Sequence, residues 1–100
     1  MKKNNKEVIK LVKVCNMNSP RSNREVCNQF EIDTPDGTYF QSYRSIIAFR
    51  GSGKIYLDVN KWDYSVTTGK YRNIFLGESK KETEKKIKEG IYILIDLNKN

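Results

Sequence analysis

The first sixty residues alternate apolar and polar side chains in a way that predicts β-strands. β-Branched residues crowd the stretch from Val8 to Cys15 and indicate a strand covered in part on both faces. A polar, proline-containing loop follows over 16–24, and regular alternation predicts a second strand over 25–33. Residues 39–50 are rich in aromatic and β-branched side chains, and residues 55–59 alternate again. These segments predict four strands.

Short turns join the last three of these strands. Thr34-Pro35-Asp36-Gly37 combines a proline, which presets its own φ, with a glycine that tolerates unusual backbone angles. Gly51-Ser52-Gly53 reverses the chain again. The four segments are therefore expected to form one antiparallel meander.

The spacing of apolar residues then becomes helical. Residues 65–76 predict a helix that ends at Gly77, because glycine readily adopts the left-handed conformation that stops a helix. Ser79 and Glu82 match a capping box, in which each side chain bonds the backbone N–H of the other residue. A second short helix is expected to begin there and to end at Gly90.

The closing segment places Ile91, Ile93 and Ile95 on one face, which predicts an inner strand of the sheet. The predicted fold class is α+β: an antiparallel sheet, made of a four-stranded meander plus a returning C-terminal strand, with two short helices between strands 4 and 5. One small domain is expected over 1–100, with 1–6 and 98–100 frayed. The predicted core consists of Phe30, Ile32, Ile47, Phe49, Ile55, Leu57, Val59, Trp62, Tyr71, Phe75, Ile91, Ile93 and Ile95.

Basic residues outnumber acidic ones, with 19 Lys and Arg against 12 Asp and Glu, for a formal net charge of +7. The excess is concentrated over 1–13 and 44–72. Such an excess favours polyanionic partners and salt-sensitive association. It equally suits a Lys-rich protein that its charge keeps soluble, and charge counts leave both interpretations open.

Composition excludes several classes of function. The chain has no histidine, which excludes Ser-His-Asp triads, Cys-His dyads and His-ligated zinc. The longest apolar run, over 91–95, is far shorter than the ~20 residues that span a bilayer. No apolar segment follows the basic residues 1–6, so we expect neither a signal peptide nor a membrane partner.

Gly51-Ser52-Gly53-Lys54 is similar to part of a phosphate-binding loop. Ile55 stands where that loop needs Ser or Thr, and the segment joins two predicted strands instead of opening a helix. The pattern therefore favours a hairpin turn.

Acidic and thiol side chains offer two further candidates. Glu31 and Asp33 share a strand face near Asp36, and paired carboxylates can hold Mg²⁺ or act as acid and base. No third ligand lies nearby in the sequence, which favours a solvated face. Cys15 and Cys27 flank a loop, and alternation need not place them on one face, so reduced thiols are favoured over a disulfide.

Aromatic and basic residues interleave over 39–72. Sheet surfaces of this kind suit single-stranded nucleic acid, because bases stack on rings and phosphates pair with cations. Ordered aromatic residues on two adjacent strands, which mark RNA-binding sheets, are not evident, and Phe49 and Trp62 are assigned to the core. The candidate binding residues of this stretch are Arg44, Lys54, Tyr56 and Lys61.

Several motifs follow one another over residues 19–98. They are Asn28-Gln29-Phe30, Tyr39-Phe40-Gln41-Ser42-Tyr43, the segment 62–76 and the closing segment 90–98. In this order they resemble a family of small, uncharacterised proteins of bacteriophages and phage-derived bacterial loci, most specifically in the Trp-Asp-Tyr-Ser-x-Thr-Thr stretch over 62–68. The resemblance implies a phage-type accessory protein in the cytoplasm of a bacterial host, and it implies no activity or cofactor.

The same stretch contains a second group of candidate binding residues. Asp63 or Ser65 is placed to cap the helix, whose N-terminus favours anions. Tyr71 is expected to point inward and Arg72 into solvent, so Lys70→Glu with Arg72→Glu should leave the fold intact and weaken binding. For Thr67, Thr68 and Lys70 a purely structural role stays equally open. The candidate residues here are Thr67, Thr68, Lys70 and Arg72.

The expected function is that of a non-enzymatic binding protein whose basic face engages nucleic acid or a host nucleoprotein complex, with defence machinery as one such target. A second hypothesis is a protein–protein inhibitor or regulator that uses a sheet edge or an apolar patch. A third, disfavoured hypothesis is a metal-dependent nuclease or hydrolase built on Glu31 and Asp33. The expected function needs no catalytic residue, metal ligand or cofactor, and the oligomeric state is left open.

Overall fold

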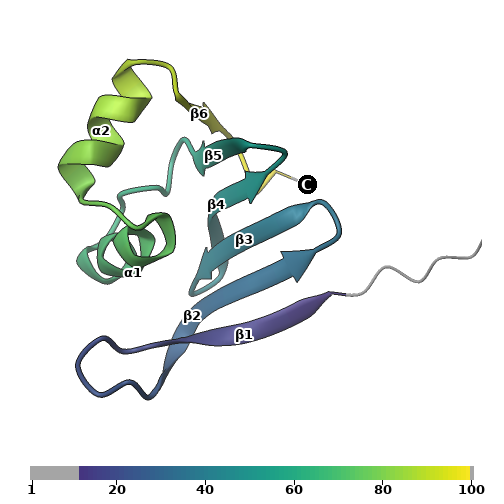
Figure 1. The fold of residues 1–100 in the computed structure, drawn as a ribbon, viewed down its shortest axis with the longest axis vertical. Helices are drawn as coiled ribbons and strands as arrows, with labels where there is room; N and C mark the ends of the chain where they lie inside the picture. The colour runs from purple at the N-terminus through teal and green to yellow at the C-terminus, as the bar shows by residue number, and fades with distance from the viewer. Residues whose placement is uncertain (1–11, 100) are drawn as a thin grey trace, which may run out of the picture.

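The computed structural model describes residues 12–99. Within this range the chain forms six strands and two helices (Figure 1). The strand predicted from Val8 lies partly outside the described residues, and the strand that is seen there extends to Asn18. In chain order the elements are β1 (Lys13–Asn18), β2 (Glu25–Thr34), β3 (Gly37–Ser42), β4 (Ser45–Gly51), β5 (Lys54–Asp58), α1 (Val66–Leu76), α2 (Lys80–Lys88) and β6 (Tyr92–Ile95).

All six strands belong to one sheet, in the order β1-β2-β3-β4-β5-β6. The first five are antiparallel neighbours, and β6 pairs in parallel with β5 at the edge of the sheet. The predicted fold was therefore wrong in three respects: the sheet has six strands, it is mixed, and both helices follow strand 5. A parallel pair needs a crossover connection, which α1 and α2 supply.

The missing strand results from a turn that the sequence does not signal. Residues 39–50 were predicted as one strand, but the chain reverses between Ser42 and Ser45 and forms β3 and β4. Tyr43 takes the left-handed conformation there, with φ 57°, at a position without glycine or proline. Local propensity thus favours extension where the folded chain turns.

Both helices begin where the sequence predicts, and α1 also ends there, whereas α2 ends at Lys88, two residues before the predicted stop at Gly90. The Ser65 hydroxyl accepts a hydrogen bond from the Thr68 backbone N–H at 3.1 Å, and Gly77 ends α1 with φ 69°. Ser79 and Glu82 form both halves of the capping box at the start of α2. Within residues 12–99 there is no helix with the length and apolarity that a membrane crossing requires.

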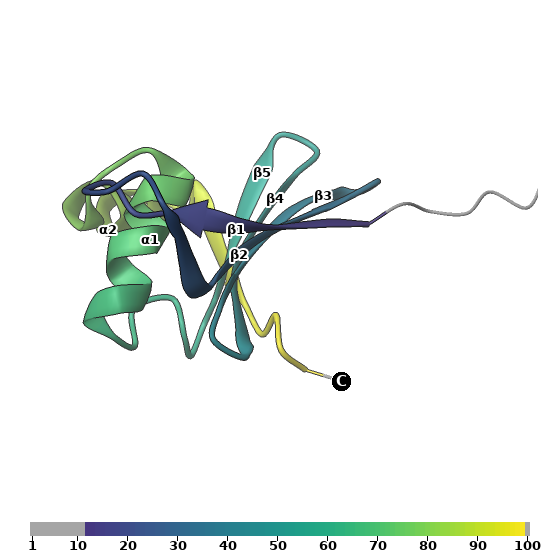
Figure 2. The ribbon, with the colours of Figure 1, turned by 90° about the horizontal axis from the view of Figure 1, so that it is seen from below.

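The helices cover only one face of the sheet (Figure 2). On that face Phe40, Leu57 and Ile47 are fully buried, and the Phe75 ring of α1 lies 5.7 Å from the Phe40 ring between centroids. Arg50 of β4 also links the sheet to α1, because its side chain donates a hydrogen bond to the Phe75 carbonyl at 3.0 Å. We call the opposite side of the sheet the open face, because no helix of the described chain lies over it.

Several residues of the predicted core lie elsewhere. Tyr92, not Ile91 or Ile93, faces the helices, and Ile91 and Ile95 are exposed. The side-chain alternation of β6 is thus one residue out of phase with the prediction. Register also places Phe30, Ile32 and Phe49 on the open face, half-buried, and Val59 is exposed. The predicted core residues that are fully or nearly buried are Ile47, Leu57, Tyr71 and Phe75.

Candidate nucleic-acid interface

Three aromatic side chains lie side by side across the open face. Tyr39 of β3 is paired with Phe49 of β4, which is paired in turn with Tyr56 of β5. Directly paired residues of neighbouring strands point to the same face, so these rings form one line across three strands. The ring centroids are 4.5 Å apart for Tyr39 and Phe49 and 6.2 Å apart for Phe49 and Tyr56. We call Tyr39, Phe49 and Tyr56 the aromatic row.

Two glycines set the position of the central ring. A Cβ atom on Gly37 would lie 2.8 Å from the Phe49 ring, and one on Gly51 would lie 2.7 Å from it. The Phe49 ring therefore lies directly over the backbone of these two residues, where any side chain would displace it. Because glycine leaves this space, Phe49 is held between the two tyrosines.

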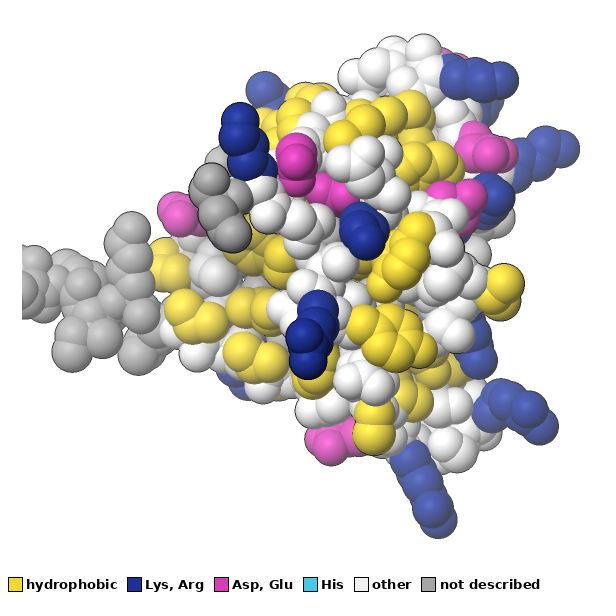
Figure 3. All heavy atoms as spheres, turned by 180° about the vertical axis from the view of Figure 1, so that it is seen from behind, with side chains coloured by type: hydrophobic (Ala, Val, Ile, Leu, Met, Phe, Trp, Pro, Cys, Tyr) yellow, Lys and Arg dark blue, Asp and Glu magenta, His cyan; other side chains and the backbone are white. Residues whose placement is uncertain are grey.

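Apolar side chains extend the open face beyond the aromatic row. Phe30 and Ile32 of β2 and Ile93 of β6 share its orientation and are half-buried. Val14 of β1 pairs with Ile32 and is 58% exposed. Seen from behind, the molecule shows apolar side chains at its surface, with Lys and Arg side chains between them and Asp and Glu side chains mainly in the upper part of the view (Figure 3). This side of the molecule is thus apolar and carries charges of both signs.

Arg50, next to Phe49 in the chain, points to the helix side, but two other cations near the aromatic row in sequence are exposed and carry no ion pair within residues 12–99. Lys54 lies two residues before Tyr56 on β5, so both point to the open face. Arg44 lies in the turn between β3 and β4, and both Arg44 and Lys54 are exposed. The ion pairs of the described chain use other cations, namely Arg72, Lys80 and Lys86.

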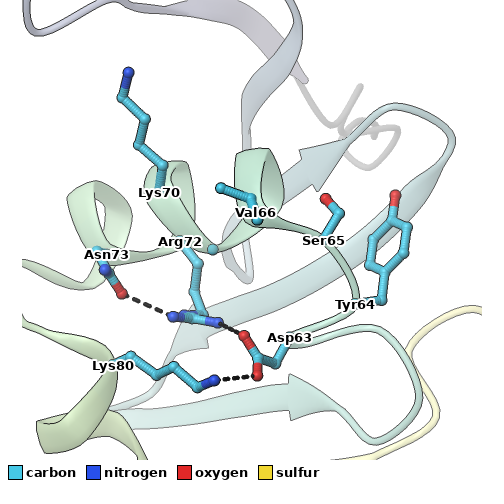
Figure 4. A pocket seen from close by; sticks show the side chains of 9 residues that line it. Asp63, Tyr64, Ser65, Val66, Lys70, Arg72, Asn73 and Lys80 are labelled. Atoms are coloured by element: carbon cyan, nitrogen blue, oxygen red, sulfur yellow. Dashed lines mark hydrogen bonds and ion pairs between the residues drawn. The ribbon is translucent and has the colours of Figure 1, made fainter.

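A hollow lies beside the N-terminus of α1, and two of the predicted binding residues, Lys70 and Arg72, line it (Figure 4). Two of the three cations that line it share a single carboxylate, that of Asp63. Arg72 is 1% exposed and donates hydrogen bonds to the Trp62 carbonyl at 2.7 Å, to Asp63 at 3.1 Å and to Asn73 at 2.9 Å. Lys80 of α2 contacts the other Asp63 oxygen at 2.7 Å. Asp63 therefore joins the linker before α1 to both helices.

The ionisation of Asp63 follows from these contacts. Partial burial alone would raise the pKa of the Asp63 carboxyl, but the hydrogen bonds from Lys80 and Arg72 outweigh burial and hold this pKa below its ordinary value. A charged carboxylate thus stands between Arg72 and Lys80 and offsets part of their positive charge.

The expectation that Arg72 points into solvent was wrong, and Thr68 is buried as well. The Thr68 hydroxyl shares a 2.8 Å hydrogen bond with Ser42 of β3. Thr67 and Lys70 are exposed, and Figure 4 shows Lys70 pointing away from the Asp63–Arg72 pair. Lys61 is half-buried, with its amine 4.9 Å from the Tyr64 ring centroid. The predicted group over 67–72 is therefore divided between core and surface.

The remaining sequence candidates lie apart from the aromatic row. Glu31 and Asp33 point to the helix side of the sheet, and Asp33 accepts a hydrogen bond from Thr38. Within residues 12–99 no group of three or more His, Cys, Asp or Glu is placed to hold a metal ion. Cys15 and Cys27 are exposed free thiols. Gly51-Ser52-Gly53-Lys54 forms the β4–β5 hairpin turn, as predicted.

Comparison with known proteins places the chain in a family. Residues 12–90, most of the chain, match the family of unknown function DUF8033. The chain belongs to this family. No curated protein and no solved structure matches it. The sequence was expected to resemble a family of uncharacterised proteins, and membership in DUF8033 confirms that expectation.

Two residues of the candidate interface in this member of DUF8033, Tyr39 and Phe49, were missed as candidate binding residues. Their place in the aromatic row depends on the pairing of β3 with β4, and the prediction merged those strands. The signal that was present is the pair of glycines at 37 and 51, each next to a hairpin turn and opposite the other. Glycines within paired strands indicate a close approach by another group, here the Phe49 ring.

Proposed function

We propose that this member of DUF8033 is a non-enzymatic, phage-type accessory protein of the bacterial cytoplasm whose basic open face engages nucleic acid or a host nucleoprotein complex. The observation that carries the proposal is the uncovered sheet face beside Arg44 and Lys54, two exposed cations without an ion pair in the described chain. The resemblance to phage proteins supports the biological setting.

The charge balance supports a polyanionic ligand. The chain has a formal net charge of +7, and Arg72, Lys80 and Lys86 are the cations whose charge nearby carboxylates offset in the described residues. A cation without a carboxylate partner gains most from a phosphate, because binding releases the counterions condensed on the nucleic acid. Affinity should therefore fall steeply with salt.

Charge reversal tests the proposal. We expect Arg44→Glu with Lys54→Glu to lower affinity for a fluorescein-labelled oligonucleotide at least about tenfold, and to lower the slope of log affinity against log salt by roughly 1 to 2. The matched control is Lys81→Glu with Lys85→Glu on the exposed side of α2, which changes the net charge equally. Equal losses in the two variants, or binding that does not change with salt, would contradict the proposal.

A protein partner is the second candidate, and one observation favours it. Val66 at the start of α1 is 91% exposed, with the 42% exposed Tyr64 close by in the chain. Large exposed apolar side chains are typical of protein contacts when they cluster. Affinity purification from nuclease-treated bacterial lysate distinguishes the candidates: a partner retained by wild type and lost with Val66→Ser supports a regulator that needs no nucleic acid.

A further inference from the structure

We infer that the aromatic row stacks on unpaired bases, so the ligand of the open face is a single-stranded nucleic acid. This inference rests on the proposed function and adds the strand state of the ligand. It concerns Tyr39 and Tyr56, on either side of Phe49.

The arrangement suits bases that are splayed out of a helix. A duplex presents phosphates and base edges to a protein, while the flat faces of its bases are stacked on one another. Rings on a sheet contact flat base faces, which are free only in an unpaired strand. The aromatic row crosses three neighbouring strands, with rings 4.5 Å and 6.2 Å apart, so a strand laid across the sheet meets the rings in succession.

The central ring and the two outer rings have different roles in the inferred contact. Phe49 lies over Gly37 and Gly51, so its position is fixed by the backbone. Tyr39 and Tyr56 are half-buried on either side of it, and neither hydroxyl takes part in a hydrogen bond within residues 12–99. Each tyrosine thus keeps one part of its ring in solvent and a hydroxyl free to bond a base or a phosphate.

Charge on the same face complements the sugar–phosphate backbone. Lys54 points to the open face two residues before Tyr56, and the only acidic side chain of that face on β5, Asp58, is 1% exposed. Both Asp58 oxygens accept hydrogen bonds from backbone N–H groups, of Leu97 and Asn60. This carboxylate is thus satisfied within the fold and does not face the ligand.

The test compares a single strand with a duplex. The probes are a fluorescein-labelled oligothymidylate of about 15 nucleotides and a labelled duplex of the same length, followed by anisotropy at one salt concentration. Tyr39→Leu with Tyr56→Leu keeps apolar cover on the sheet and removes the aromatic faces. Tyr64→Leu, at an exposed tyrosine in the linker before α1, is the matched control.

We expect wild type to bind the oligothymidylate at least about tenfold more tightly than the duplex. The double variant should lose roughly five- to hundredfold in affinity for the single strand for each stacked base, and change little on the duplex. The control should bind both probes as wild type does.

Equal binding of both probes, unchanged in the double variant, would overturn the inference and leave the proposed function standing. Failure to bind either probe would overturn both, as would self-association through the open face without nucleic-acid binding. If the double variant does not fold, the inference is tested by photocrosslinking wild type to an oligonucleotide that contains 4-thiothymidine. Adducts at Tyr39 or Tyr56 would support the inference, and adducts confined to the helices would overturn it.

Discussion

Replacing Arg72 with alanine should destabilise the protein strongly, although its sequence position suggested a surface cation. The side chain is 1% exposed and makes three hydrogen bonds, to the Trp62 carbonyl, to Asp63 and to Asn73. The guanidinium carbon also lies 5.1 Å from the Trp62 ring centroid. Alanine would leave the carbonyl without its donor and would open a cavity between the linker and α1.

The size of the effect follows from these contacts. Removing one partner of a buried ion pair costs about 3–5 kcal/mol. The Asp63 side chain is 31% exposed and would keep its ion pair with Lys80 in the variant, so we expect a cost at the lower end of that range. We expect Arg72→Ala to lower the free energy of unfolding by about 3 kcal/mol. For a domain of this length such a change corresponds to a fall in Tm of roughly 12–24 °C.

Urea unfolding followed by the fluorescence of Trp62, the one tryptophan, measures this change directly. The control is Lys70→Ala two residues earlier, whose exposed side chain should change stability by no more than about 0.5 kcal/mol. A loss below about 1 kcal/mol for Arg72→Ala would refute the structural role and return Arg72 to the candidate binding residues.

Three further predictions concern other parts of the fold. Burial alone would raise the pKa of the Glu78 carboxyl, but hydrogen bonds from Lys86, Thr83 and Tyr92 hold it below its ordinary value of 4.5. The stabilisation of the folded state by the charged Glu78 carboxylate is therefore complete above pH 4.5 and is lost as pH falls through the lower pKa of the folded state. In acid titrations followed by circular dichroism, Glu78→Gln should consequently lose less stability than wild type between about pH 5 and pH 3. Phe75→Ala, 5% exposed in wild type, should cost about 3–5 kcal/mol in urea unfolding, and a loss below about 1 kcal/mol would show that the core is assigned wrongly. Gly51→Ala should lower Tm, because its Cβ would lie 2.5 Å from the Asp36 carbonyl oxygen, and an unchanged Tm would contradict that close approach.

Local signals predicted the helices well because their ends depend on neighbouring residues. Ser65, the Ser79–Glu82 box and Gly77 each act within one turn of the chain, so their spacing in the sequence is sufficient. The hairpin turn at 51–54 was predictable for the same reason, since Ser52 and Gly53 take the left-handed angles that such a turn needs.

The sheet was less predictable because its faces depend on distant partners. In β6 the apolar pattern Tyr-Ile-Leu-Ile has no polar side to mark the solvent face. Tyr92 points inward, where its hydroxyl donates a hydrogen bond to the carboxylate of Glu78, fourteen residues earlier. The same applies to Arg72, whose burial depends on the Trp62 carbonyl and on Asp63. Sequence spacing does not show such contacts.

The candidate site was only partly predictable. Lys54 and Tyr56 were recognised from the interleaving of cations and rings, and the structure places both on the open face. Tyr39 and Phe49 joined them only through the strand register. Because a one-residue slip moves every side chain of a strand to the other face, a surface that spans three strands requires the structure.

The central claim is that the open face of the sheet binds a single strand through the aromatic row. The most direct measurement is a nuclear magnetic resonance titration of the ¹³C-labelled rings with an unlabelled oligothymidylate. Ring stacking on a base shifts the resonances of the contacted protons, so the account predicts the largest changes at Tyr39 and Tyr56, with Phe49 between them also shifted. Saturable shifts confined to Tyr64 and the helices, with the aromatic row unmoved, would contradict it.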